Sequence, residues 1–183
     1  MSDIVVDPDI SLRPYTPEHA ELLSPLLEAN RAYLEPWVRL PGLVADVESY
    51  RNVLSELQER QSRGEVGGGS IVYRGELVGD VNFDGGFWAS TGHAVGISYW
   101  ITEKFQGRGI VTRACERVVT LAFETPGIAK VELSAAAHNK RSRRIIERLG
   151  FRLDGVLRSE LKRRDDLHDL AVYSMLRPEW LAR

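Results

Sequence analysis

The sequence predicts an α/β fold of the α+β kind, with a mixed sheet flanked by helices. Two observations support this: helical patterns separate some β-rich runs, and other β-rich runs follow one another as hairpins. A length of 183 residues corresponds to one domain of ordinary size, so we expect residues 1-183 to form a single domain. Hydrophobic residues make up 43% and charged residues 27%, which excludes an intrinsically disordered or collagen-like chain.

The first third of the chain predicts a strand and two helices. A short strand over 10–14 is followed by Thr16-Pro17, an N-cap with proline at the first helical position. Leucines at helical spacing continue this helix until Pro36 interrupts the pattern. Asp46 is the expected N-cap of a second helix, which ends just before Gly64.

The middle of the chain predicts paired strands. The three glycines at 67–69 predict a break, and the two β-rich runs around Gly75-Glu76 predict a hairpin. A loop over 84–92 then leads to a run rich in β-branched and aromatic residues. The three expected strands are 70–74, 77–83 and 93–101.

The last part of the chain alternates helices and strands. A glycine turn over 106–109 precedes a long apolar-faced helix that ends near Thr125-Pro126-Gly127. The remaining expected elements are a strand over 130–137, a helix over 140–149 that Gly150 stops, and strands near 151–161 and 168–176.

Charge is distributed unevenly, although the net charge is only −2. Residues 1–103 contain 7 basic and 16 acidic side chains, whereas residues 104–164 contain 15 basic and 6 acidic ones. The densest basic run is Lys140, Arg141, Arg143, Arg144 and Arg148. Such a run is a solvated helix face, a nucleic-acid contact or the site of a ligand with several phosphates, and charge alone leaves all three open.

The turn from the third strand into the long helix is a candidate anion site. Its unpaired backbone N–H groups and positive dipole end attract an anion, and two glycines allow a pyrophosphate to approach closely. An ordinary strand-to-helix turn is the alternative. Neither a Walker loop nor a complete dinucleotide fingerprint is present. The residues concerned are Gln106, Gly107, Arg108, Gly109, Ile110, Val111 and Thr112.

This turn resembles the acetyl-coenzyme A loop of the GNAT N-acetyltransferases, which follows the pattern Q/R-x-x-G-x-G/A. Gln106 and Gly109 match it, and Val111 departs from it. Four further segments resemble the RimJ/RimL branch: 34–38, 96–101, 139–144 and 147–151. The resemblance covers essentially the whole chain. It implies the GNAT fold, a mixed and mostly antiparallel twisted sheet flanked by helices, with the cofactor loop at a strand-turn-helix.

The resemblance also implies how acetyl-coenzyme A, as co-substrate, is bound. The backbone of Tyr99, Trp100 and Ile101 would bond the pantetheine arm while their side chains enter the core. Residues 106–112 would bind the pyrophosphate, and Asn139 would bond the pantetheine in addition to capping a helix. The cluster Arg141, Arg143 and Arg144 would contact phosphates.

Acetyl transfer to an amine requires a neutral amine, a polarised carbonyl and a stabilised thiolate. The tyrosine acid of many relatives is replaced here by Ile146. By resemblance, Ser142 donates a proton to the thiolate and Glu160 accepts one from the amine. The alternatives are a first-turn helix hydroxyl for Ser142, a surface strand residue for Glu160, and a water chain or His138 as base.

The remaining reactive residue types favour no second chemistry. Cys115 is expected to be an inert core thiol on the apolar face of its helix. His19, His93 and His168 are scattered in sequence without metal-ligand spacing, so no metal is expected.

The predicted function is transfer of an acetyl group from acetyl-coenzyme A to a primary amine by direct attack in a ternary complex. The acceptor is a protein N-terminus, such as that of a ribosomal protein, or a small molecule. Residues 31–45 and 84–92 are expected to shape the acceptor side, and the acidic excess of 1–103 mildly favours a cationic amine. The alternative is a catalytically silent module that binds coenzyme A, nucleic acid or the ribosome.

The expected location follows from two signals that the sequence lacks. No run approaches the ~18 to 20 apolar residues of a membrane span, and the first residues lack the basic segment of an export signal. We therefore expect a cytoplasmic enzyme with no membrane partner, and a homodimer stays open as a mode of assembly.

Overall fold

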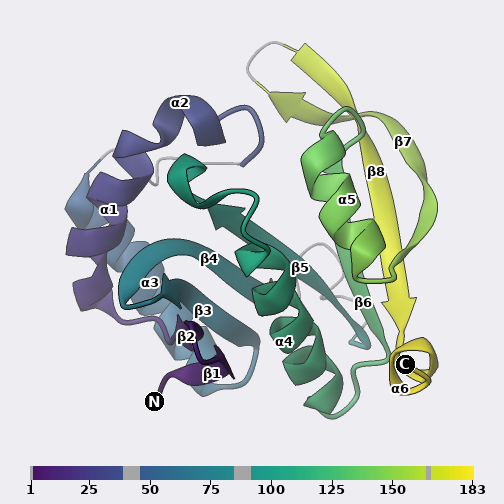
Figure 1. The fold of residues 1–183 in the computed structure, drawn as a ribbon, viewed down its shortest axis with the longest axis horizontal. Helices are drawn as coiled ribbons and strands as arrows, with labels where there is room; N and C mark the ends of the chain where they lie inside the picture. Colours follow the sequence, from purple (N-terminus) through teal and green to yellow (C-terminus); the bar gives the residue numbers. More distant parts are fainter. Residues whose placement is uncertain (1, 39–45, 85–91, 164–165) are drawn as a thin grey trace.

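A single eight-stranded sheet runs through the computed structural model, which describes residues 2–38, 46–84, 92–163 and 166–183. The strand order is β1-β2-β3-β4-β5-β6-β8-β7 (Figure 1). Every neighbouring pair is antiparallel except β5 and β6, which are parallel. The predicted mixed, mostly antiparallel sheet is therefore confirmed. The strands are β1 (Ile4–Asp7), β2 (Ile10–Arg13), β3 (Val66–Tyr73), β4 (Glu76–Asp84), β5 (Ala94–Ile101), β6 (Lys130–Ala136), β7 (Arg152–Arg163) and β8 (Asp166–Leu176).

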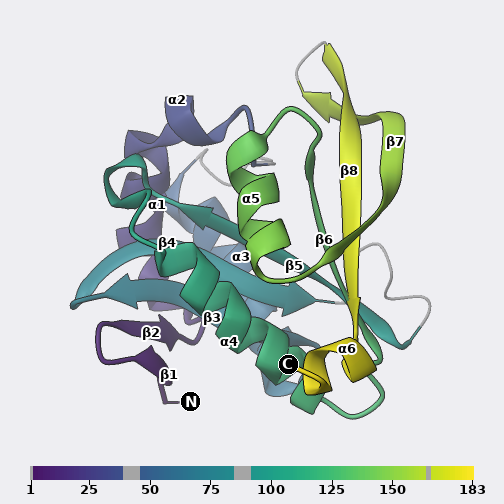
Figure 2. The ribbon, with the colours of Figure 1, turned by 45° about the vertical axis from the view of Figure 1, so that its right-hand side comes forward.

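Helices cover both faces of this sheet (Figures 1 and 2). On one face, α1 and α3 enclose a buried cluster that includes Leu23, Leu27 and Leu54. On the other face, α4 packs on the larger buried cluster, and α5 lies beside β6 and β8. The α-helices are α1 (Ala20–Ala29), α2 (Arg31–Leu34), α3 (Val47–Ser62), α4 (Ile110–Glu124), α5 (Lys140–Arg148) and α6 (Arg177–Leu181), with 3-10 turns at η1 (Pro17–His19) and η3 (Glu103–Phe105).

Short-range signals in the sequence set most element boundaries. The Asp46 side chain accepts a hydrogen bond of 2.6 Å from the Ser49 N–H and so begins α3. Asn139 begins α5 in the same way, accepting from the Ser142 N–H at 3.1 Å. The predicted β3–β4 hairpin turns at Arg74 and Gly75, both at positive φ, as a two-residue hairpin turn requires. These predicted caps and turns are confirmed.

The glycines at 67–69 do not form the predicted break. They lie inside β3, which is hydrogen-bonded to β4 across them. A Cβ atom on Gly68 would lie 2.3 Å from the Val81 carbonyl oxygen, and one on Gly69 would lie 2.2 Å from that of Arg13. The glycines therefore permit close approach of the neighbouring backbones, which the sequence pattern could not distinguish from a loop.

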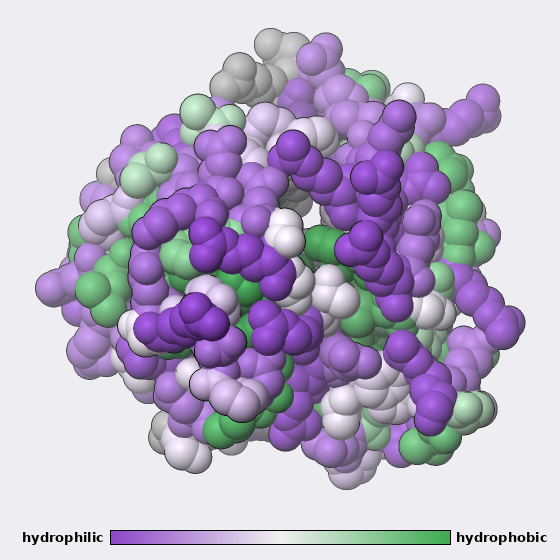
Figure 3. Space-filling view, in the orientation of Figure 1, coloured by the Kyte–Doolittle hydropathy of each residue, from purple (hydrophilic) through white to green (hydrophobic). Residues whose placement is uncertain are grey.

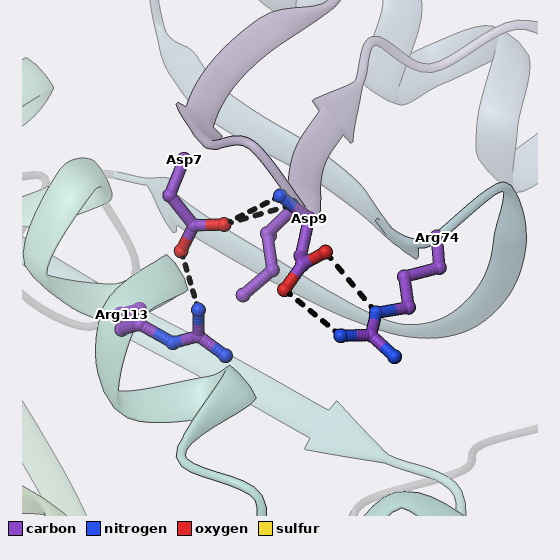
Figure 4. Close-up of polar contacts among 5 residues, drawn as sticks. Asp7, Asp9, Arg74 and Arg113 are labelled. Carbon is purple, nitrogen blue, oxygen red and sulfur yellow. Dashed lines mark hydrogen bonds and ion pairs between the residues drawn. The ribbon is translucent and has the colours of Figure 1, made fainter.

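Only one strand of the N-terminal hairpin was predicted. The second strand, β1, lies before the turn that follows Asp7, and the sequence did not indicate it. Figure 4 shows how this hairpin is attached: the Arg113 guanidinium of α4 bonds Asp7 at 2.6 Å, and Asp9 pairs with Arg74 at 3.1 Å. The second carboxylate oxygen of Asp7 accepts from the backbone N–H groups of Asp9 and Ile10. The hairpin is thus held to both α4 and the β3–β4 turn.

The first predicted helix is divided in the structure, because α1 ends at Ala29 and α2 begins at Arg31. The helix α6 was not predicted, because it is shorter than the window over which helical periodicity is visible. None of the helices in the described ranges has the length and apolar character needed to cross a membrane.

Candidate active site

The parallel strands β5 and β6 separate part of the way along the sheet. They pair over only three positions, from Ala94 opposite Lys130 to Gly96 opposite Glu132. Beyond Gly96, β5 stays paired with β4 and β6 stays paired with β8. Residues 97–101 of β5 thus have one backbone edge without a strand partner in the described part of the chain. A cleft of about 1100 Å³ opens there.

The cleft brings together most of the predicted site residues. It is bounded by β5, the glycine turn, the start of α5 and the segment after α2. Figure 3 shows this face hollowed between the start of α4 and α5, with hydrophilic side chains around the rim. The predicted residues that line it are Tyr99, Trp100, Ile101, Gln106, Gly107, Arg108, Gly109, Ile110, Val111, Thr112, Asn139 and Ser142.

The glycine turn has the geometry of an anion site. Gly107 and Gly109 have φ values of 72° and 71°, a conformation that L side chains rarely adopt, and Gly109 is the N-cap of α4. The helix begins its hydrogen bonding with the Arg113 N–H to the Gly109 carbonyl at 3.2 Å, so the preceding N–H groups have no acceptor within the helix. A Cβ atom on either glycine would meet nothing within 4 Å. The space beside both glycines is therefore open.

Ser142 is held by a side chain whose polar role the sequence reasoning missed. The Tyr99 hydroxyl lies 2.6 Å from the Ser142 hydroxyl. The ring of Tyr99 packs against the buried cluster under α4, as expected, but its polar end reaches the cleft. Burial raises the pKa of the Tyr99 phenol above its ordinary value, so it stays protonated. The alternation of inward and outward side chains along β5 could not predict this contact, because it does not indicate which residue of α5 faces the strand.

The basic run divides between two surroundings. Lys140, Arg141, Arg144 and Arg148 line the cleft, and the Arg141 guanidinium bonds the Gln106 side chain at 2.7 Å. Arg143 is not among the lining residues. Its guanidinium donates to the Tyr173 hydroxyl at 2.7 Å and to the Ala137 carbonyl at 3.1 Å. The structure therefore does not bring Arg143 to the predicted cofactor site.

Glu160 lies apart from the cleft lining. It is an exposed residue of β7, next to Ser159, which has a φ of 53° at an irregularity in the β7–β8 pairing. The structure thus does not place the predicted base beside Ser142, and its role stays a prediction.

His138, the alternative base, does line the cleft. Its ring centroid lies 5.4 Å from that of Trp37 and 4.8 Å from that of His168. His168 is distant in sequence but belongs to this cluster, which only the β6–β8 pairing could reveal.

The other reactive groups lie elsewhere. Cys115 is fully buried, which raises the pKa of its thiol and agrees with the predicted core role. Among the described residues, no group of His, Cys, Asp or Glu side chains is arranged to hold a metal ion.

The chain belongs to the acetyltransferase (GNAT) domain family, whose model matches residues 9–152. It is 32% identical over 180 residues to the putative ribosomal N-acetyltransferase YdaF of Bacillus subtilis (strain 168), covering 96% of this chain and 95% of the relative. The predicted resemblance to this family, and to its ribosomal-protein acetyltransferases, is confirmed.

Solved structures show the same fold. A crystal structure of a probable acetyltransferase superposes with a TM-score of 0.88 at 30% identity, covering 98% of this chain and 99% of the other. RimL, a ribosomal L7/L12 alpha-N-protein acetyltransferase in complex with coenzyme A, superposes with a TM-score of 0.87 at 24% identity, covering 96% and 98%. The predicted GNAT fold is therefore confirmed.

Proposed function

We propose that this protein transfers the acetyl group of acetyl-coenzyme A to a primary amine, and that the amine is the N-terminus of a ribosomal protein. The observation that carries the donor half is the unpaired edge of β5 leading directly to the open glycine turn at Gly109. Family membership supports the reaction type, and the name of the Bacillus relative supports the acceptor.

The cleft residues suit the pantetheine arm and the phosphates of a coenzyme A ester. The backbone edge over Tyr99–Ile101 offers hydrogen-bonding groups to the amides of the pantetheine arm, and the Asn139 amide group faces the same space. The N–H groups at the start of α4 suit the pyrophosphate. Because Arg143 is held by Tyr173, we assign the phosphate contacts to Arg141, Arg144 and Arg148.

Acetyl-coenzyme A supplies a thioester whose carbonyl carbon the amine nitrogen attacks. The new C–N bond forms as the C–S bond breaks, and the sulfur leaves as a thiolate. We assign proton donation to this thiolate to the Ser142 hydroxyl, with Tyr99 bonded to it at 2.6 Å as the group that replaces the proton.

A group must also take the proton from the amine. We retain Glu160 as a candidate on the resemblance, although it is exposed and outside the cleft lining. His138 has the geometric advantage because it lines the cleft. The two candidates give different outcomes in the experiments of the Discussion.

We further propose a cytoplasmic location, where ribosomal proteins are made, and one domain over residues 1-183, because a single sheet joins both ends of the chain. A small-molecule amine and a homodimer remain the alternatives for acceptor and assembly.

The experiment that tests the function is thiol release from acetyl-coenzyme A in the presence of peptides and small amines. Peptides that copy the N-termini of ribosomal proteins should be acetylated at the α-amine, as shown by the mass of the product. If simple amines react and no such peptide does, the acceptor assignment is wrong. If no amine in the panel promotes thiol release while the coenzyme binds, the silent module is the better description.

A further inference from the structure

A second and smaller cavity lies on the face of the sheet that α1 and α3 cover. Its volume is about 160 Å³. It meets the cleft at β5, because Val38 and residues 98–100 line both spaces. Its own walls are mostly apolar or aromatic, with two polar side chains from β4: Tyr15, Leu27, Tyr50, Val53, Leu57, Asp80 and Asn82.

Asp80 is the one acidic side chain among the described residues that line this cavity, and it is only 6% exposed. One carboxylate oxygen accepts from the Tyr15 hydroxyl at 2.7 Å and from the Asn82 amide at 3.2 Å. The other is 3.5 Å from the Ser70 hydroxyl, at the limit of a hydrogen bond. None of the Lys or Arg side chains in the described ranges forms an ion pair with Asp80.

A buried carboxylate with neutral partners only is an incomplete arrangement. Burial disfavours its charged form and raises the pKa of Asp80 to about 7. The titratable groups that face it are the phenols of Tyr15 and Tyr50, which supply no positive charge. A ligand cation is the group that this cavity lacks.

We propose that the cavity binds the protonated amine of the acceptor, with Asp80 as its counter-ion and the rings of Tyr15, Tyr50 and Trp100 around it. This inference rests on the proposed function and gives it a substrate class: a primary ammonium carried on a small, uncharged group. At 160 Å³ the cavity is smaller than the roughly 300 Å³ or more of a complete ligand site, so only the amine-bearing end enters. An acidic first residue is excluded because Asp80 would repel it.

The location of the cavity suits this role. The donor space lies between β5 and the helices α4 and α5, and the cavity lies across β5 from it. An amine held there approaches the acetyl group from the face opposite Ser142, and it attacks after its ammonium has passed one proton to the base of the proposed function. The acidic excess of residues 1–103, which build this side, favours the same kind of acceptor.

The test uses a short peptide with a free N-terminal alanine and the same peptide with its N-terminus acetylated, titrated into the full-length protein loaded with coenzyme A. At pH 6 the peptide amine is protonated and the Asp80 carboxyl is largely neutral. Binding of the ammonium requires Asp80 to ionise, so one proton passes from its carboxyl group to the buffer. Calorimetry in two buffers of different ionisation enthalpy measures this proton.

The free peptide should bind with release of nearly one proton, and the acetylated peptide should bind at least 10-fold more weakly. Asp80→Asn should abolish the proton release and lower the affinity for the free peptide at least 10-fold, without changing the affinity for coenzyme A. Asp9→Asn, which alters an exposed carboxylate at the distant β1–β2 turn, is the matched control and should behave as the parent. Val53→Phe, which fills the cavity without altering the carboxylate, should also prevent peptide binding and serves if Asp80→Asn does not fold.

The inference is overturned if the free peptide does not bind, or if its affinity and proton release are the same in Asp80→Asn as in the parent. A structural role for the Tyr15–Asp80–Asn82 contacts would then remain. The proposed function fails separately, if the peptide binds with proton release and yet is never acetylated when acetyl-coenzyme A replaces coenzyme A.

Discussion

The hydroxyl oxygens of Tyr99 and Ser142 lie 2.6 Å apart, where the end of β5 meets the first turn of α5. The position at which the resemblance places a tyrosine in many relatives is Ile146 here, and Ile146 is fully buried. The phenol that contacts Ser142 comes from β5 instead. If the pair acts as one donor to the leaving thiolate, its two members should not contribute independently.

We expect Ser142→Ala and Tyr99→Phe each to lower kcat by about 10²-fold, and the double variant to be little worse than either, because general acid catalysis contributes about 10²- to 10⁴-fold and requires the pair. Initial rates of thiol release measure this. The matched control is Ser62→Ala. It removes an exposed hydroxyl at the end of α3 that donates to the Glu59 carbonyl, outside the cleft. Independent, multiplying losses would show that the two hydroxyls do not form one donor.

Substitution of Gly109 separates backbone strain from loss of the phosphate space. Gly109→Ala should cost roughly 1–2 kcal/mol of stability, because its φ is 71°. Gly109→Glu should in addition abolish acetyl-coenzyme A binding, because its carboxylate would occupy the open space before the helix N-terminus. Calorimetry measures the affinity and thermal unfolding the stability.

The control for this prediction lies near the other end of α4. Gly127 also has a positive φ, 86°, and a Cβ atom added there would meet nothing within 4 Å. Gly127→Glu should therefore reduce stability and leave acetyl-coenzyme A binding unchanged. Normal binding by folded Gly109→Glu would place the pyrophosphate elsewhere.

The base can be identified from the pH dependence of two variants. If Glu160 accepts the amine proton, Glu160→Gln should lose about 10²-fold in rate at neutral pH and recover in part in alkali, where solvent deprotonates the amine. Rates of peptide acetylation between neutral and alkaline pH measure this. His138→Asn should show that profile instead if the cleft histidine is the base. A parental profile in both variants would indicate a water chain.

The basic residues on α5 should act on the cofactor more than on nucleic acid. Charge reversal at Arg141 and Arg144, which line the cleft, should lower the affinity for acetyl-coenzyme A at least 10-fold. The same change at Arg143 should have a much smaller effect on the cofactor, because Tyr173 and the Ala137 carbonyl hold its guanidinium. Equilibrium binding of acetyl-coenzyme A and of RNA at several salt concentrations checks this. Unchanged cofactor affinity together with loss of salt-dependent RNA binding would favour the nucleic-acid alternative.

The buried carboxyl of Asp80 should make stability depend on pH. Its pKa is raised from 3.8 to about 7 by burial, so the folded state binds its proton more tightly than the unfolded state does. The contribution of the protonated Asp80 carboxyl to the stability of the folded state is fully present below about pH 4, and it is lost as the pH rises to about 7. We expect the free energy of unfolding of the parent, measured with urea across this range, to fall by up to about 4 kcal/mol relative to that of Asp80→Asn. A constant difference between the two proteins would show that Asp80 does not titrate in this range.

Much of this protein could be predicted where neighbouring residues carry the signal. The caps at Asp46 and Asn139, the turn at Gly75 and the left-handed glycines before α4 all depend on contacts within a few residues. The glycine turn and its flanking segments were sufficient to predict the family and the fold, and the donor site that they indicate stays a prediction. Periodicity and turn signals failed for the glycines of β3, for β1, for the division between α1 and α2, and for the short α6.

Tertiary structure decided which side chains meet. Arg143 and Arg144 are adjacent in sequence, yet only Arg144 faces the cleft, because the rotation of α5 is set by its packing on the sheet. Tyr99 meets Ser142 across 43 positions of sequence, where β5 has separated from β6. His138 meets His168 across 30 positions, because β6 pairs with β8. Long-range pairing of strands fixes such positions, and no local propensity encodes it. The sequence alone determined most of the elements and the glycine turn, whereas the packing of helices on a divided sheet brought the Tyr99 and Ser142 hydroxyls together and formed the cavity that Asp80 lines.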